Sequence, residues 1–357
     1  MKSNKMEFKI CDRNIGNNNN AFIVAELSAN HIQRFDLAVK TIKAMRDAGA
    51  DAVKLQTYTP DTITMNSRNK YFMIKQGTMW DGKSLYDLYK EAYTPWEWHP
   101  KLMKCAKDLG LICFSSPFDR TAVDFLEKMN APAYKIASFE ITDIPLIKYV
   151  ASKKKPIIIA TGIADLNDIK LAVDTCRKAG NNKLALLKCT SAYPAPFSEM
   201  NLRTIPDMEK RFKTIVGLSD HSLGISAPIA AVALGAKIIE KHFILDRKLS
   251  GPDAPFSLEP GEFKEMVRSI REAEKALGMV TYKLTEKMKK SREHSRSLFA
   301  VKNINAGESF SEVNVRSIRP GFGLPPRYLN NIIGKKANKV IEKGTPLSWD
   351  LIKKGND

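Results

Sequence analysis

The sequence predicts an α/β fold: a (β/α)₈ TIM barrel followed by a small, mostly β domain. Two observations carry this prediction. Eight short apolar runs, rich in β-branched residues, alternate with helix-period segments over roughly the first 280 residues. Continuous apolar runs of this kind are typical of fully buried parallel strands. Beyond residue 282 the pattern changes to short strands separated by turns rich in Gly and Pro.

Each expected strand is an apolar run that stops at a polar or charged residue. In chain order the runs cover residues 22–25, 52–53, 112–114, 133–136, 157–160, 184–187, 215–218 and 238–239. The polar residues at their ends are Glu26, Lys54, Gln56, Ser115, Ser116, Ser138, Thr161, Lys188, Thr190, Asp220, His221, Lys241 and His242, and Lys135 lies within the fourth run. The C-terminal strand ends of a barrel form its active site, so we expect these side chains to converge on one mouth.

Helix-period segments separate the expected strands. They cover residues 35–48, 96–109, 121–129, 144–152, 166–179, 202–212, 225–234 and 260–277. The connection over residues 58–94 is much longer than usual, and its aromatic content favours an ordered cover over the active site. We expect a barrel domain over residues 1–282, a charged linker over 283–296 and a compact domain over 297–357, with strands at 298–301 and 315–318.

Composition narrows the function classes. The net charge of +18 raises the possibility of nucleic-acid binding, but the lysines are scattered over helix faces without a basic arm or RNA-binding motif. We therefore expect no nucleic-acid partner. The five cysteines show no CxxC spacing, which is typical of reduced thiols in a cytoplasmic protein. No apolar stretch approaches the roughly 18 residues of a membrane span, so we expect no membrane association.

Two histidines give the sharpest local signal for a cofactor. His221 and His242 each follow an expected strand end, and their strands are neighbours in a barrel. Two imidazoles so placed would share one divalent ion, such as Mn²⁺, Co²⁺ or Mg²⁺, and leave positions open for water or substrate. A structural role for each histidine remains the alternative.

Lysines and hydroxyls at strand ends indicate an anionic substrate. Lys54 and Lys135 suit a carboxylate or a phosphate. Schiff-base catalysis and ion pairs with Glu26 or Glu140 remain alternatives for these lysines. Neutral donors and a glycine that permits close backbone approach occur near the same strand ends: Ser116, Ser138, Gly162, Ser191 and Ser219.

Eight motifs in order along the chain carry a family resemblance. They are AELSANH at 25–31, VKLQT at 53–57, FSSPFD at 114–119, PAYKIAS at 132–138, GLSDH at 217–221, EKHF at 240–243, GPD at 251–253 and IRPG at 318–321. Together they resemble the sialic acid synthase family, phosphoenolpyruvate-dependent nonulosonate synthases whose barrel is followed by an antifreeze-like (SAF) domain. Within that family, residues 26–31, 77–82, 85–98 and 321–325 are most similar to the members that make pseudaminic acid.

The resemblance implies a role for each matching residue. The residues that match phosphoenolpyruvate-binding positions are Lys54, Ser116, Lys135, Ser138, Ser191 and Ser219. His221 and His242 match the metal ligands. Glu26 matches the acid/base, and the sugar contacts are Gln56, Tyr193 and Asp253. Arg319 matches the SAF arginine that reaches the partner's barrel in a homodimer. Ala160 and Ser191 replace a serine and an asparagine of neuraminate synthases, which affects the phosphate contacts.

The implied reaction joins phosphoenolpyruvate, 2,4-diacetamido-2,4,6-trideoxy-L-altrose and water to give pseudaminic acid and phosphate by C–O cleavage. A neuraminate or legionaminate synthase, a metal-dependent aldolase and a non-enzymatic nucleic-acid- or ice-binding protein are the alternatives. For the sugar methyl group we expect an apolar wall built from Leu27, Ser28 and Ala29 and covered by Phe72, Met79 and Trp80.

Overall fold

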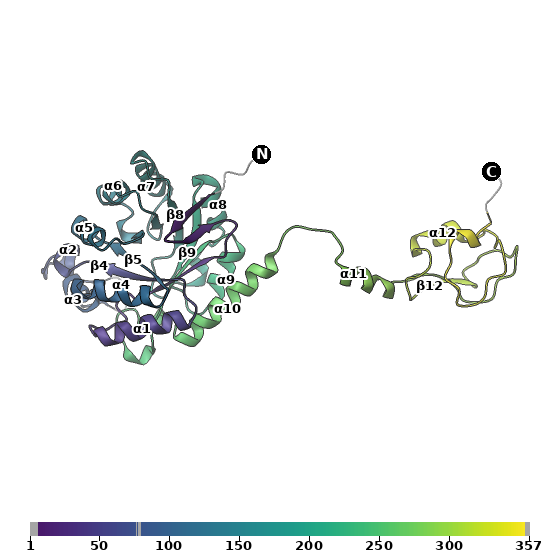
Figure 1. The fold of residues 1–357 in the computed structure, drawn as a ribbon, viewed down its shortest axis with the longest axis horizontal. Helices are drawn as coiled ribbons and strands as arrows, with labels where there is room; N and C mark the ends of the chain where they lie inside the picture. Colours follow the sequence, from purple (N-terminus) through teal and green to yellow (C-terminus); the bar gives the residue numbers. More distant parts are fainter. Residues whose placement is uncertain (1–5, 76, 78–79, 354–357) are drawn as a thin grey trace. The chain divides into compact units, whose positions relative to one another are not determined.

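The chain forms two compact units in a computed structural model that describes residues 6–75, 77 and 80–353. The units are Met1–Gly278 and Met279–Asp357 (Figure 1). The domain and linker boundaries expected at residues 282/283 and 296/297 stay a prediction. None of the helices in the described ranges is both long enough and apolar enough to cross a membrane.

The first unit is a closed barrel of eight parallel strands, which confirms the predicted fold class. Around the barrel the order is β10-β3-β4-β5-β6-β7-β8-β9. The strands are β3 (Phe22–Glu26), β4 (Ala52–Thr57), β5 (Ile112–Pro117), β6 (Tyr134–Ile136), β7 (Ile157–Ala160), β8 (Leu184–Cys189), β9 (Ile215–Asp220) and β10 (Ile238–His242). Each strand therefore neighbours the next one along the chain, and β10 closes against β3.

Helices surround the barrel (Figure 1). They are α1 (Phe35–Asp47), α4 (His99–Asp108), α5 (Arg120–Lys128), α6 (Ile144–Ser152), α7 (Leu166–Lys178), α8 (Thr204–Phe212), α9 (Ser226–Ala233) and α10 (Pro260–Leu277). Aspartate side chains cap three of them by accepting bonds from free backbone N–H groups: Asp119 at α5, Asp143 at α6 and Asp165 at α7. The long connection after β4 contains α2 (Pro60–Ile63) and α3 (Leu85–Ala92).

Alternate residues of each strand face the barrel interior, and this period of two sorts the interior into layers. Near the strand starts the interior is apolar, with Phe22, Val24, Phe114 and Ile158 in one buried cluster. An unpredicted hairpin of β1 (Glu7–Ile10) and β2 (Arg13–Gly16) adds its own apolar side chains to that cluster and so closes the N-terminal end. Further along the strands the same phase places polar residues inside: Glu26, Lys54, Ser116, Lys135, Ser219 and Glu240.

The second unit is small and built around its own core. Its β11 (Ser297–Ala300) pairs antiparallel with β12 (Val315–Ile318), as expected for the tail. The core includes Leu298, Phe310 and Ile341, and isolated bridges such as Ile304 with Ile341 hold the remaining segments. Two short helices, α11 (Glu286–Ser291) and α12 (Leu329–Ile332), complete the unit.

Candidate active site at the C-terminal end of the barrel

The C-terminal strand ends surround a cavity of about 730 Å³. Its lining includes most of the residues expected at the site: Lys54, Gln56, Lys135, Ser138, Ser191, Tyr193, Ser219, His221, His242 and Asp253. Glu26 and Ser116 do not line the cavity but contact Lys54 directly. Arg319 belongs to the second unit.

A buried charge network forms the floor of this cavity. The Lys54 ammonium group forms an ion pair with Glu26, lies 3.4 Å from Glu240 Oε1 and donates to Ser116 Oγ at 3.3 Å. Lys135 donates to the same Glu240 oxygen at 3.2 Å. All four charged side chains belong to residues at most 4% exposed. Of the expected ion pairs, Lys54 forms the one with Glu26, whereas Lys135 pairs with Glu240 instead of Glu140.

The two carboxylates of the network have opposite protonation behaviour. Burial raises the pKa of Glu26 to about 7, with Lys54 opposing the shift and Glu240 adding to it. Burial also disfavours ionisation of Glu240, but Lys135 and Lys54 outweigh it and lower its pKa to about 2. Glu240 therefore stays ionised and holds both lysines, while Glu26 can gain or lose a proton near neutral pH. Such a separation of pKa values is typical of acid/base sites.

His221 and His242 meet at one side of the cavity, with ring centroids 5.3 Å apart. His221 Nδ1 lies 3.1 Å from the Thr190 carbonyl oxygen, which only accepts, so in the neutral ring Nδ1 carries the hydrogen and Nε2 keeps its lone pair. His242 Nδ1 is buried, lies 3.5 Å from Asp253 Oδ2 and makes no hydrogen bond within the described residues. Burial also holds the pKa of His242 well below its usual range, which favours the neutral ring.

The two rings fit a divalent ion as ligands. In the described part of the chain no group of three or more His, Cys, Asp or Glu side chains has the geometry of a metal centre. An ion held by His221 and His242 would therefore take its remaining ligands from water or substrate, as open catalytic sites do.

The hydroxyl groups of Ser138 and Ser191 converge on Gly162. The Gly162 N–H donates to Ser138 Oγ at 3.1 Å, and Ser191 Oγ is buried without a hydrogen-bond partner among the described residues. A Cβ atom at Gly162 would lie only 2.1 Å from Ser191 Oγ. Glycine is therefore required here for the hydroxyls to approach. The neighbouring Ala160 lines the cavity with a methyl group and offers no hydrogen bond.

Not every polar residue at a strand end faces the cavity, so that part of the sequence-based expectation is wrong. Ser115 bonds to Thr57 at 2.7 Å, Lys188 donates to the Cys189 carbonyl at 2.8 Å, and Asp220 pairs with Lys241 at 2.5 Å. Ser115, Lys188 and Asp220 occupy outward-facing positions, because neighbouring side chains along a strand alternate between its two faces.

Sequence reasoning assigned no role in the site to two carboxylates, Glu240 and Glu140. Glu240 shares the phase of His242 on β10, so the strand period alone would have placed it inside the barrel. Glu140 lies on a 3₁₀ turn after β6, lines the cavity and has no hydrogen-bond partner for Oε2 in the described chain. Burial raises the pKa of Glu140 to about 7.

The apolar wall differs from the one expected. Ser28 and Ala29 line the cavity, but Leu27 is fully buried in the core between strands and helices. The long connection contributes Trp80 and Tyr89 to the lining, and Phe72 is not among the lining residues. Met79 lies outside the described residues. The expectation of an aromatic cover is thus met by Trp80, whose ring centroid lies 5.6 Å from that of Tyr193.

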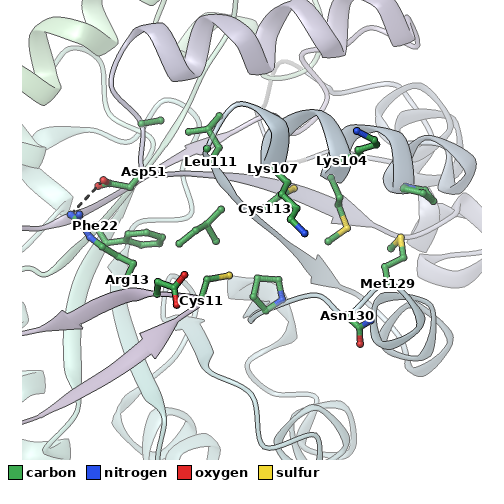
Figure 2. A pocket seen from close by; sticks show the side chains of 17 residues that line it. Cys11, Arg13, Phe22, Asp51, Lys104, Lys107, Leu111, Cys113, Met129 and Asn130 are labelled. Atoms are coloured by element: carbon green, nitrogen blue, oxygen red, sulfur yellow. Dashed lines mark ion pairs between the residues drawn. The ribbon is translucent and has the colours of Figure 1, made fainter.

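A larger cavity, about 980 Å³, lies at the N-terminal end of the same barrel (Figure 2). Its lining includes strand starts such as Phe22 and Ile112, with Arg13 and Asp51 at one side. Asp51 is already bound by Arg13 at 3.4 Å and by Arg271 at 3.1 Å. None of the candidate site residues predicted from sequence lines this cavity, so the smaller cavity is the candidate active site.

Comparisons with known proteins identify the family of the chain. A model of the NeuB family matches residues 41–282, and a SAF domain model matches residues 295–353. A Campylobacter jejuni protein named pseudaminic acid synthase is 48% identical over 94% of this chain and 97% of its own. A Legionella pneumophila protein named N,N'-diacetyllegionaminic acid synthase is 36% identical over 94% of this chain and 96% of its own.

Solved structures agree as well. The N-acetylneuraminic acid synthetase of Leptospira borgpetersenii, in complex with citrate, matches with a TM-score of 0.72 and 30% identity. That match covers 81% of this chain and 96% of the other. Both the family model and full-length relatives thus match the region that builds the barrel and its cavity. The chain belongs to the NeuB family.

Proposed function

We propose that the protein is a pseudaminic acid synthase, a transferase that joins phosphoenolpyruvate to 2,4-diacetamido-2,4,6-trideoxy-L-altrose. One observation carries the proposal: Lys54 and Lys135 share Glu240 at the floor of a cavity bordered by His221 and His242. The two ammonium groups share the ionised Glu240, and Glu26, which pairs with Lys54, loses its charge when it is protonated. The protonated state of Glu26 therefore leaves positive charge for an anionic substrate. The relative that bears this name, at 48% identity, supports the choice of sugar.

In the proposed reaction, C3 of phosphoenolpyruvate forms a bond to the aldehyde carbon of the open-chain sugar. The oxygen of water then adds to C2. The bond between C2 and the bridging oxygen breaks, and that oxygen leaves with phosphorus as inorganic phosphate. Lys54 and Lys135, with Ser116, Ser138, Ser191 and Ser219, bind the carboxylate and phosphate groups. Glu26 accepts the proton of the attacking water and returns it to the sugar oxygen, because its pKa is near 7.

The remaining roles concern the sugar and the cofactor. Gln56, Tyr193 and Asp253 bind the sugar at the aromatic side of the cavity. His221 and His242 would hold a divalent ion, Mn²⁺, Co²⁺ or Mg²⁺, which when bound would supply Lewis-acid polarisation of the aldehyde. The lowered pKa of His242 and the contact between His221 Nδ1 and the Thr190 carbonyl oxygen support this assignment.

The sugar is tested by comparing kcat/KM for three acceptors: the diacetamido altrose sugar, the acceptor of legionaminate synthases and N-acetylmannosamine. We expect a preference of at least about 100-fold for the altrose sugar, since wrong stereochemistry leaves polar groups of the site unpaired. The product is identified by mass and NMR. Equal kcat/KM for N-acetylmannosamine would contradict the proposal and favour the neuraminate alternative.

The proposal includes a homodimer in which the SAF domain of one subunit reaches the partner's barrel, so that Arg319 contacts the sugar. The SAF match and the resemblance at residues 318–321 support it. Mixed dimers of Arg319→Ala and Glu26→Gln subunits provide a test, because only an arginine acting across the dimer completes one site. Activity should return in the mixed dimer, and its absence would contradict the arrangement. The cytoplasmic location and the lack of a nucleic-acid partner stay predictions.

A further inference from the structure

Asp220 and Lys241 form an ion pair with no solvent exposure of either side chain. They lie on neighbouring strands, directly opposite each other in the register of β9 and β10. Each immediately precedes one of the two imidazoles, since Asp220 comes before His221 and Lys241 before His242. Neither residue lines the cavity within the described chain.

The surroundings make this pair unusual. Other residues of the same outward phase, such as Leu218, Ile239 and Phe243, belong to the apolar core between the barrel and its helices. A buried ion pair in such a place is rarely more stabilising than a well-packed apolar pair, because both charges must be removed from water. Stability alone therefore gives no reason for a lysine and an aspartate at these positions.

The contacts of the pair fix the chain on both sides of His221. Lys241 Nζ donates to Asp220 Oδ2 at 2.5 Å and also to the carbonyl oxygen of Ser222. Asp220 Oδ1 accepts from the Ser222 N–H at 2.9 Å. Residues 220 and 222 are thus tied to each other and to the residue that precedes His242.

We infer that Asp220 and Lys241 are positioning residues that set the separation and orientation of the His221 and His242 imidazoles. This inference rests on the proposed function, in which the two rings hold a divalent ion. The pair acts from behind the barrel wall and touches neither substrate. Its loss therefore changes the affinity for the ion and leaves the affinity for phosphoenolpyruvate, which binds to the lysines, nearly unchanged.

Two variants test the inference: Lys241→Met and the double variant Asp220→Asn/Lys241→Met. The double variant leaves no unpaired charge in the core, and its asparagine still offers an oxygen to the Ser222 N–H, so it folds even where the single variant is too unstable. Mn²⁺ affinity is measured by electron paramagnetic resonance, phosphoenolpyruvate affinity by calorimetry and stability by thermal unfolding. We expect Mn²⁺ binding to weaken about 10- to 100-fold in the double variant, as for other residues that orient metal ligands.

Lys155→Met is the matched control, because it removes a half-buried ion pair with Glu127 before β7, away from the cavity. It should lower stability and leave Mn²⁺ affinity unchanged. The inference is overturned if the double variant binds Mn²⁺ as tightly as the unaltered protein. It is also overturned if Mn²⁺ affinity rises in step with thermal stability from the single to the double variant. Failure of the unaltered protein to bind Mn²⁺, Co²⁺ or Mg²⁺ would be a separate result, which overturns the proposed metal site itself.

Discussion

The two ends of the barrel each hold a cavity, and the larger one lacks the features of an active site. The N-terminal cavity, about 980 Å³, has exposed lysines at its rim and an aspartate already satisfied by two arginines. The C-terminal cavity, about 730 Å³, has four charged residues buried beneath it and carboxylate and hydroxyl oxygens without partners in the described chain. Burying charge opposes folding unless each group is paired. Within the described residues, the buried charge network lies at the C-terminal end, and it indicates the candidate site better than cavity volume does.

The alternation of side chains along each strand explains why the two ends of the barrel interior differ in polarity. Interior positions near the strand starts are apolar and pack against the β1–β2 hairpin, while the same phase a few residues later is polar. The comparison predicts that substitutions at the C-terminal end change catalysis strongly and that substitutions at the N-terminal end do not.

The largest effect is expected at the imidazole pair. His221→Ala or His242→Ala should lower kcat by about 10³-fold or more, because Lewis-acid assistance is worth several kcal/mol. Chelation should abolish the activity of the unaltered protein, and a divalent salt should restore it. Circular dichroism checks that the variants remain folded. Full activity of chelated His221→Ala protein would show that the rings do not serve a metal.

The lysines should have the next largest effect. Lys54→Met or Lys135→Met removes a charged hydrogen-bond donor worth roughly 1.5 to 3 kcal/mol, so kcat/KM for phosphoenolpyruvate should fall about 10- to 100-fold. Borohydride treatment during turnover should trap no adduct. A covalent adduct at either lysine would contradict the proposed role in anion binding and would favour the aldolase alternative.

Glu140 should affect stability in a pH-dependent manner. Its pKa is raised by burial from 4.5 to about 7, so between these values only the folded state holds the proton. The stability associated with the protonated form is complete below pH 4.5 and is lost as the pH rises through 7. Glu140→Gln should therefore become more stable relative to the unaltered protein, by roughly 2 kcal/mol, between pH 5 and pH 8. Thermal unfolding at both pH values measures this, and a constant difference would contradict the raised pKa.

The smallest effect is expected at the N-terminal cavity. Lys104→Ala and Lys107→Ala remove two exposed side chains that line it. Since neither is buried, kcat/KM should stay within about twofold of the unaltered value and stability within about 0.5 kcal/mol. Steady-state kinetics measures the first quantity. A large loss of activity would mean that the larger cavity takes part in function, contrary to the contrast between the two ends.

Much of the barrel could be predicted because buried parallel strands leave a strong local signal. The helix after β3, expected at 35–48, is Phe35–Asp47, and the other helices begin and end within three residues of the expected bounds. The β1–β2 hairpin was missed because its apolar residues, Phe8, Ile10 and Ile15, are interleaved with charged ones near the chain start. Its burial depends on the barrel interior that it covers, which is a tertiary effect.

The site could be predicted only in part. The polar ends of the strands indicate Lys54, Lys135, His221 and His242. Only the alternation of side chains along β10 separates the inward Glu240 from the outward Lys241. Leu27 illustrates the same point, since it follows Glu26 directly and therefore faces away from the cavity. Glu140 comes from a 3₁₀ turn, where no period of two applies.

Under the proposed function, the C-terminal cavity joins phosphoenolpyruvate to the sugar, and water attacks C2 of phosphoenolpyruvate. The most direct measurement is a reaction in H₂¹⁸O with phosphoenolpyruvate and the diacetamido altrose sugar, followed by mass spectrometry of both products. We predict one ¹⁸O atom in the newly formed pseudaminic acid at the former C2 of phosphoenolpyruvate and none in the released phosphate. Label in the phosphate, or a product formed without phosphate release, would contradict the proposed reaction.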